Sequence, residues 1–143
     1  KDGITAAVAV LCALDSWRRE GRSPWDVLDD LARRHGAHVT SNGSVPLAPG
    51  VDPAQRCGDL ARTASVGGVQ VVSVDHPAPD ITRLELVDRT RVILRPSGTE
   101  PKLKYYVEAI EPVHHDGDVR VARDAAGMHA EHIAAELRTV LAR

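Results

Sequence analysis

Four strand patterns follow one another between residues 69 and 113, and this run limits the possible folds more than any other feature of the sequence. The first three segments are short and rich in Val, Ile and Leu, and the last alternates apolar and polar residues. Asp88-Arg89-Thr90 fits a tight turn between the second and third segments. The expected strands cover residues 69–74, 81–87, 91–94 and 103–113.

Two helices are expected before these strands. Residues 4–20 carry apolar side chains three and four positions apart, and Asp2 precedes them in the position of an N-terminal cap. A second helix is expected over residues 24–34, because Ser23 can cap it and Pro24 suits a first turn. Basic residues close both patterns, which complements the helix dipole.

A polar stretch over residues 40–53 contains several glycines and prolines and no regular apolar pattern, so we expect a domain linker there. A third helix is expected over residues 54–64, and Asp118 can cap a final helix with an apolar stripe. Helices before and after a run of adjacent strands indicate an α+β fold, with a small antiparallel sheet and flanking helices.

Composition excludes several classes of protein. The net charge is −2 and only 3% of the residues are aromatic, so nucleic acid is not an expected partner. No apolar run is long enough for a membrane helix, and we expect a cytoplasmic protein without a membrane partner. Cys12 and Cys57 lack metal-ligand spacing and are interpreted as two reduced core thiols. Lys1 is not a translation start, so we expect the chain to be a piece of a longer protein.

The segment R-P-S-G-T-E-P-K at residues 95–102 lies between the third and fourth expected strands. Arg95 can donate two parallel hydrogen bonds to phosphate oxygens, and the hydroxyls of Ser97 and Thr99 can donate as well. Gly98 allows the backbone to approach an anion, and the flanking prolines reduce the ordering cost of binding. The same residue types also suit an ordinary hairpin loop with solvated side chains, and composition alone leaves both interpretations open.

The sequence R-P-S-G-T-E-P, followed by K-L-K-Y-Y, resembles the phosphate-binding loop of the α-D-phosphohexomutase family, which includes phosphoglucomutases and phosphomannomutases. The K-L-K-Y-Y continuation looks most like the branch that holds phosphopentomutases and glucose-bisphosphate-forming relatives. The start of the chain, K-D-G-I, resembles the closing helix of the family's third domain. The resemblance therefore implies three parts: residues 1–39 from the end of the third, α/β domain, a linker over 40–53, and the fourth domain, with a TBP-like fold, over 54–143.

This resemblance implies a role for each residue of the loop. The substrate phosphate contacts of the family correspond to Arg95, Ser97, Gly98 and Thr99, with Lys102 as a weaker addition. In the family an isomerase reaction of carbohydrate metabolism transfers a phosphoryl group between a phosphoserine and a sugar phosphate, through a bisphosphate intermediate and with Mg²⁺. The resemblance implies that this piece holds the phosphate that does not react. It also implies Mg²⁺ and a sugar bisphosphate activator for the full-length enzyme, and missing N-terminal domains as partners.

The family's phosphoserine, metal and sugar-recognition motifs do not occur in the chain, so we expect no catalytic residue, no metal ligand and no activity from this piece alone. The sugar therefore stays open between glucose, mannose and a pentose. A phosphopentomutase of the same family is one alternative. A free-standing phosphosugar-binding module is another, and a structural domain whose loop has lost its ligand is the third.

Glu100 is expected to pair with Lys102, Lys104 or Arg95 and so to stabilise the loop. His129 and His132 would share one helix face, but no third metal ligand is indicated. The apolar stripe of residues 4–17 is expected to pack back on the linker or to form a dimer contact.

Overall fold

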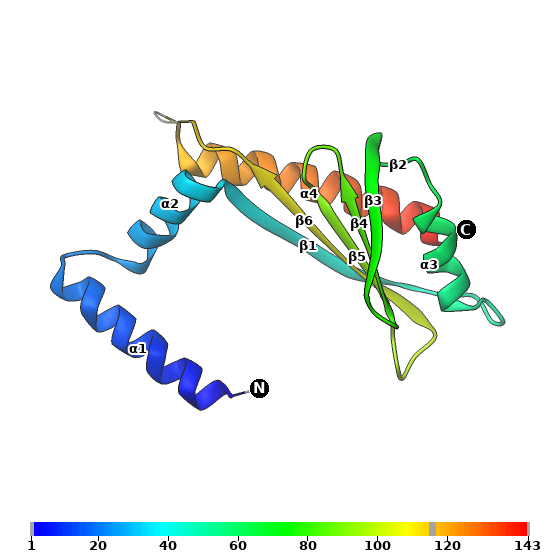
Figure 1. The fold of residues 1–143 in the computed structure, drawn as a ribbon, viewed down its shortest axis with the longest axis horizontal. Coiled ribbons are helices and arrows are strands. Elements are labelled where there is room, and N and C mark those ends of the chain that lie inside the picture. Colours follow the sequence, from blue (N-terminus) through cyan, green and yellow to red (C-terminus); the bar gives the residue numbers. More distant parts are fainter. Residues whose placement is uncertain (1, 115–116, 143) are drawn as a thin grey trace.

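The computed structural model describes residues 2–114 and 117–142, and Figure 1 shows their arrangement. Four helices and six strands form an α+β fold, as the sequence predicted. Their bounds, in chain order, are α1 Gly3–Arg19, α2 Pro24–His35, β1 Ala37–Pro46, α3 Pro53–Ala61, β2 Ser65–Val66, β3 Val69–Ala78, β4 Ile81–Leu86, β5 Arg91–Pro96, β6 Lys102–Glu111 and α4 Val119–Leu141.

The strands form one sheet in the order β1-β6-β5-β4-β3-β2, and every neighbouring pair is antiparallel. Strand β6 shows the predicted alternation, since Leu103, Tyr105, Val107 and Ala109 are buried on one face. The core on this face also contains buried residues of α3 and α4. Helix α4 lies along the sheet over β1 and β6 (Figure 1). Because α3 and α4 share this core, they cover the same face of the sheet. The opposite face is mixed and carries charged side chains such as Arg91 and Glu108 beside apolar ones such as Ile93.

The helix starts follow the expected capping chemistry. The carboxylate of Asp2 accepts hydrogen bonds from the Ile4 and Thr5 amides of α1. Ser23 caps α2 together with the Asp26 carboxylate, and Asp118 caps α4 through the Arg120 amide. Each cap satisfies backbone donors that the helix itself leaves unpaired, which confirms these three starts.

The expected linker over residues 40–53 is wrong for its first half. Residues 40–46 belong to β1, a ten-residue strand that pairs along the whole length of β6. The misleading signal was Asn42-Gly43, which is typical of a turn. In the strand, Gly43 lies opposite Tyr105, and a β-carbon at this position would lie 2.5 Å from the Tyr105 hydroxyl. Glycine is present here because the aromatic ring needs the space.

Helix α1 forms as predicted but buries none of its residues. It lies apart from the sheet in Figure 1, and Ile4 is 82% exposed. The expectation that its stripe packs back on the linker is therefore wrong, whereas the expected dimer contact stays a prediction. Cys12 is exposed on this helix, so only Cys57 is a core thiol. No described helix is both long and apolar enough to cross a membrane.

Candidate functional site

The loop singled out by the sequence connects β5 to β6 at one end of the sheet. Its ends are closed by the Ser97 amide, which donates to the Lys102 carbonyl at 2.9 Å, and by the Lys102 amide, which donates to the Glu100 carbonyl at 2.8 Å. The Leu47 amide donates to the Pro101 carbonyl at 2.8 Å, which ties the loop to the segment after β1. These backbone hydrogen bonds hold the base of the loop on the rigid sheet.

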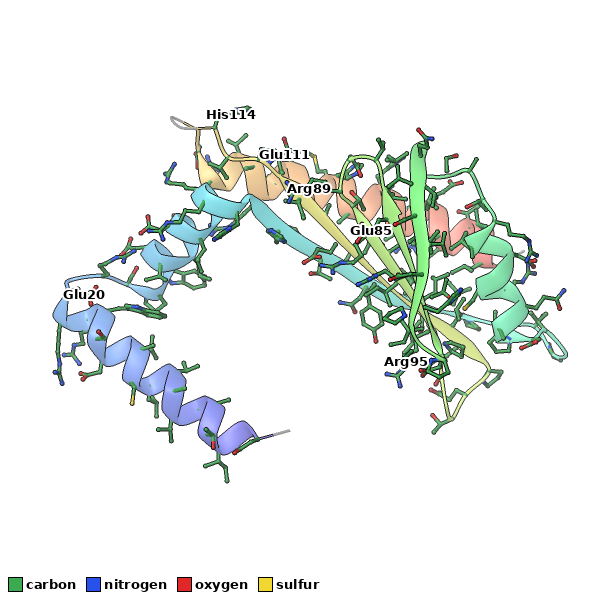
Figure 2. All side chains as sticks on the ribbon, in the orientation of Figure 1. Glu20, Glu85, Arg89, Arg95, Glu111 and His114 are labelled. Atoms are coloured by element: carbon green, nitrogen blue, oxygen red, sulfur yellow. The ribbon has the colours of Figure 1, made fainter. Side chains whose placement is uncertain are left out.

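Arg95 occupies an exposed position near the end of β5, as the stick view in Figure 2 shows. Its Nε donates to the Oδ2 of Asp80 at 2.8 Å, and both side chains are about half exposed. Because this contact uses Nε, the two Nη groups can still donate to an incoming oxyanion. Asp80 therefore orients the guanidinium and leaves both Nη groups available as donors.

Two lysines of β6 add positive charge beside Arg95. Lys104 lies directly opposite Arg95 in the register of β5 and β6. Lys102 Nζ contacts Glu100 Oε2 at 2.5 Å, so Lys102 is the partner of Glu100 among the three that were expected. This hydrogen bond, with the nearby charge of Lys104, lowers the pKa of Glu100, which keeps the carboxylate ionised and joined to the strand.

Ser97, Gly98 and Thr99 form the tip of the loop, where Gly98 and Thr99 are exposed. No described contact uses the hydroxyls of Ser97 or Thr99, so both remain able to donate. A β-carbon added to Gly98 would meet nothing within 4 Å, so packing within this chain does not require glycine there. The open space above Gly98 suits a bound group that approaches the backbone closely.

The structure thus brings Arg95, Lys102 and the three tip residues together around one hairpin end. Asp80 is the residue that sequence reasoning missed. Because β4 pairs with β5, the turn before β4 lies beside the end of β5, and the strand register could have indicated this. The arrangement offers hydrogen-bond donors and positive charge, which is the chemistry of anion binding.

The two histidines that could have suggested a metal are engaged otherwise. His129 Nε2 lies 2.7 Å from Asp88 Oδ2, and His132 Nε2 lies 3.1 Å from the carbonyl oxygen of Gly67. Over residues 2–114 and 117–142, the structure contains no group of three or more His, Cys, Asp or Glu side chains that could hold a metal ion.

Comparison with known proteins gives a family and a fold. The sequence profile of the phosphoglucomutase/phosphomannomutase C-terminal domain matches residues 54–126. A probable phosphomannomutase of Haemophilus influenzae is 32% identical over 116 residues, covering 76% of this chain and 24% of that protein. A phosphoglucosamine mutase of Bordetella petrii is 40% identical over 112 residues, covering 78% of this chain and 20% of that protein.

A solved structure shares the architecture. The open form of parafusin, a phosphoglucomutase from Paramecium, superposes with a TM-score of 0.58 at 18% identity, and the match covers 100% of this chain and 28% of that one. This likeness shows the fold alone. The chain spans 20–24% of the length of the two curated relatives.

Proposed function

The chain belongs to the phosphoglucomutase/phosphomannomutase family through its C-terminal domain, and on this premise we propose that it binds the phosphate group of a sugar phosphate. The observation that carries the proposal is the hairpin end between β5 and β6. There Arg95 is oriented through Nε, and the same short loop contains the hydroxyls of Ser97 and Thr99, which no described contact uses. Gly98 and Lys102 complete the proposed site.

We propose that this loop positions the substrate and transfers nothing itself. A phosphate held at a fixed point restricts the rotation and translation of the sugar, and this contributes to orienting the hydroxyl that reacts elsewhere. In a reaction through a bisphosphate intermediate, the same site would hold first one phosphate and then the other. The loop would therefore act in both halves of the interconversion of a sugar 1-phosphate and a sugar 6-phosphate.

The catalytic parts of such an enzyme would come from other segments of a longer polypeptide. The described residues do not fit the Mg²⁺ that the family implies, because they contain no cluster of three metal-ligating side chains. We propose that the phosphoserine, the metal ligands and the binding site of a bisphosphate activator lie in those other segments, that the chain alone is inactive, and that the protein is cytoplasmic.

The substrate is proposed as a hexose phosphate, because the relatives are named phosphomannomutase and phosphoglucosamine mutase. A pentose phosphate stays the alternative, since K-L-K-Y-Y at the start of β6 resembles the branch of the family that holds phosphopentomutases. The 20–24% coverage of the relatives favours an enzyme part over a free-standing binding module. A native polypeptide several times larger than 15.4 kDa in the source cells would support the enzyme part. A band at 15.4 kDa would overturn it.

The binding proposal is tested by calorimetric titration of the chain with glucose 6-phosphate. Arg95→Ala removes a charge-assisted contact with the phosphate and is expected to weaken binding by on the order of 1.5 to 3 kcal/mol. Arg18→Ala is the matched control, because it removes one exposed arginine on α1, far from the loop (Figure 1). Equal affinity in the Arg95 variant and the unchanged chain would overturn the proposal.

A further inference from the structure

A second group of cationic side chains lies at the end of the sheet opposite Arg95. A hollow there is lined by the last turn of α2, the turn between β4 and β5, and the end of β6. We call it the distal hollow and define it by its lining residues Arg33, Arg34, His35, Gly36, Arg89, Ile110, Pro112 and Val113. In Figure 2, Arg89 and Arg95 mark the two ends of the sheet.

The arginines of the distal hollow differ from most other described arginines, because no described carboxylate pairs with them. Within residues 2–114 and 117–142, nine arginines form ion pairs with a carboxylate: residues 19, 22, 62, 83, 91, 95, 120, 123 and 138. Among the described residues, neither Arg34 nor Arg89 has such a partner, and Arg33 donates only to the Gly117 carbonyl, at 3.0 Å. The described residues of the lining include no acidic one. Positive charge is therefore concentrated here, and no described residue of the lining compensates it.

Gly36 brings two of these arginines against the sheet. It ends α2 with a φ of +94°, and its amide donates to the Ala32 carbonyl at 2.8 Å. A β-carbon here would lie 2.8 Å from Ile110 Cγ2 and 3.2 Å from the Glu111 carbonyl oxygen. Only glycine allows so close an approach at this backbone angle, so the last turn of α2, with Arg33 and Arg34, is held beside β6.

Arg89 is in an unusual backbone conformation. Its φ is +70°, and it is the only described residue other than glycine with a positive φ. Glycine or asparagine would occupy this turn position with less strain. An arginine at such a position, with its side chain lining a hollow that already contains two others, is the kind of outlier that points to a function.

The dipole of α2 explains only part of this cluster. Cations are favoured at a helix C-terminus, which accounts for Arg33 and Arg34. It does not account for Arg89, which comes from a different element and adds a third guanidinium to the same hollow. Three like charges in one hollow repel one another, and a bound anion would relieve that repulsion.

We propose that the distal hollow is a second anion-binding site that takes a phosphate group, separate from the loop at residues 95–102. Guanidinium groups bind phosphate through paired hydrogen bonds, which suits this site to phosphate better than to a monatomic anion. Ile110, Pro112 and Val113 provide an apolar wall that can contact the carbon skeleton of a phosphate ester. The proposal rests on the distal residues alone and does not depend on what the loop binds.

The test is an NMR titration of the 143-residue chain with inorganic phosphate at constant ionic strength. Saturable shifts of the backbone amides of residues 34–36 and 88–90 are expected. Amides of residues 97–99 report separately on the loop, so failure at one site does not affect the interpretation of the other. Shifts confined to the loop, or equal shifts when chloride replaces phosphate, would overturn the proposal.

Two variants and one control complete the test. Arg34→Gln and Arg89→Gly are each expected to weaken phosphate binding at the distal amides about threefold to tenfold. Glycine accepts the positive φ of residue 89, so Arg89→Gly keeps the turn, and unchanged spectra elsewhere verify folding. Arg18→Gln, which removes an exposed arginine outside the hollow, should leave the affinity unchanged. Unaltered binding in both distal variants contradicts the proposal.

A repeat with glucose 6-phosphate separates the two sources of a phosphate group. Tighter binding of the ester at the distal amides identifies a phosphate ester that uses the apolar wall. Equal affinity identifies free phosphate as the ligand. Absence of shifts with both probes overturns the site.

Discussion

Helices α1 and α4 have similar local chemistry and opposite surroundings. Both start at an aspartate cap and carry apolar side chains at helical spacing, yet α1 buries no residue and α4 buries eight. The difference is the sheet, which covers α4 and does not reach α1 (Figure 1). Caps and periodicity decide where a helix forms, whereas burial depends on what lies next to it.

The chain consists of a part with a shared core and a helix, α1, that lies outside that core. The sheet, α3 and α4 share one core, so they are expected to unfold together. Helix α1 contributes little to that core, and among the described residues nothing covers its apolar side. A second copy of the chain, or another part of a longer polypeptide, could supply that cover.

The two cysteines give the largest expected contrast. Cys12 is exposed on α1, whereas Cys57 is buried in α3, where burial raises the pKa of its thiol. In the folded chain at micromolar concentration, Cys12 should react with a thiol reagent on the order of a thousandfold faster than Cys57, whose reaction requires opening of the core.

Single variants Cys12→Ser and Cys57→Ser assign the two phases, and the rates should become similar in denaturant. Slow reaction of Cys12 that becomes faster on dilution would show that α1 is covered by a second copy. Fast reaction of both thiols in the folded chain would contradict the division.

Leucine truncation tests the same contrast through stability. Leu137 of α4 is fully buried, and Leu137→Ala leaves a cavity in the core, so the free energy of unfolding should fall by about 2 to 5 kcal/mol. Leu11→Ala removes the same atoms from the exposed side of α1 and should change the free energy of unfolding by less than about 0.5 kcal/mol. Urea denaturation of both variants measures the difference. Equal losses would mean that α1 is packed in solution.

The sequence predicted the elements that depend on local chemistry. Asp2, Ser23 and Asp118 identified three helix starts, and the alternation over residues 103–113 predicted β6 with its buried face. Strand β1 was missed because Asn42-Gly43 is a turn signal when read alone. Its meaning depends on Tyr105, which is 62 positions away in the sequence and directly opposite Gly43 in the sheet. Such pairings are set by tertiary contacts, and no local pattern contains them.

Gly43 is expected to be sensitive to substitution because it lies opposite Tyr105. Gly43→Ala places a β-carbon 2.5 Å from the Tyr105 hydroxyl, which also accepts a hydrogen bond from Arg138 Nη1 at 2.8 Å. Displacing this ring should lower the free energy of unfolding by about 1 to 3 kcal/mol. Gly98→Ala is the control, because a β-carbon there meets nothing within 4 Å. Thermal and urea unfolding of both variants measure the effect, and a neutral Gly43→Ala would show that the ring shifts freely.

The residues of the candidate site differ in how far the sequence alone could bring them together. The loop over residues 95–102 could be recognised because its ligand chemistry is contiguous in sequence. Asp80, which orients Arg95, was missed because it lies outside this motif, and finding it requires the register of β4 on β5. Arg33 and Arg89 of the distal hollow are likewise far apart in the sequence. Residues 40–46 of the expected linker form an edge strand because they pair with β6, which is also far away in the sequence.

The smallest expected effect is the acid sensitivity of an ion pair on the open face of the sheet. Glu108 accepts a hydrogen bond from Arg91 Nε at 3.1 Å and lies 3.4 Å from His38 Nδ1. The Arg91 hydrogen bond lowers the pKa of Glu108 against the opposing effect of burial, and His38 adds to the lowering. A carboxyl whose pKa is lower in the folded state stabilises the fold above its unfolded pKa, about 4.3 for glutamate. That contribution is lost as pH falls through the folded pKa.

Glu108→Gln should therefore cost about 1 kcal/mol or less at pH 7, and the cost should disappear as pH falls below about 4. Urea unfolding of both proteins at a series of pH values measures this difference. Asp15→Asn on α1 is the control, because the Asp15–Arg19 pair is exposed and Arg19 is 78% accessible, so no comparable pH-dependent cost is expected. A Glu108→Gln cost that stays constant from pH 7 to pH 3 would show that the side chain contributes by packing and not by its charge. A cost confined to higher pH would show that this ion pair of the sheet makes an acid-sensitive contribution to stability.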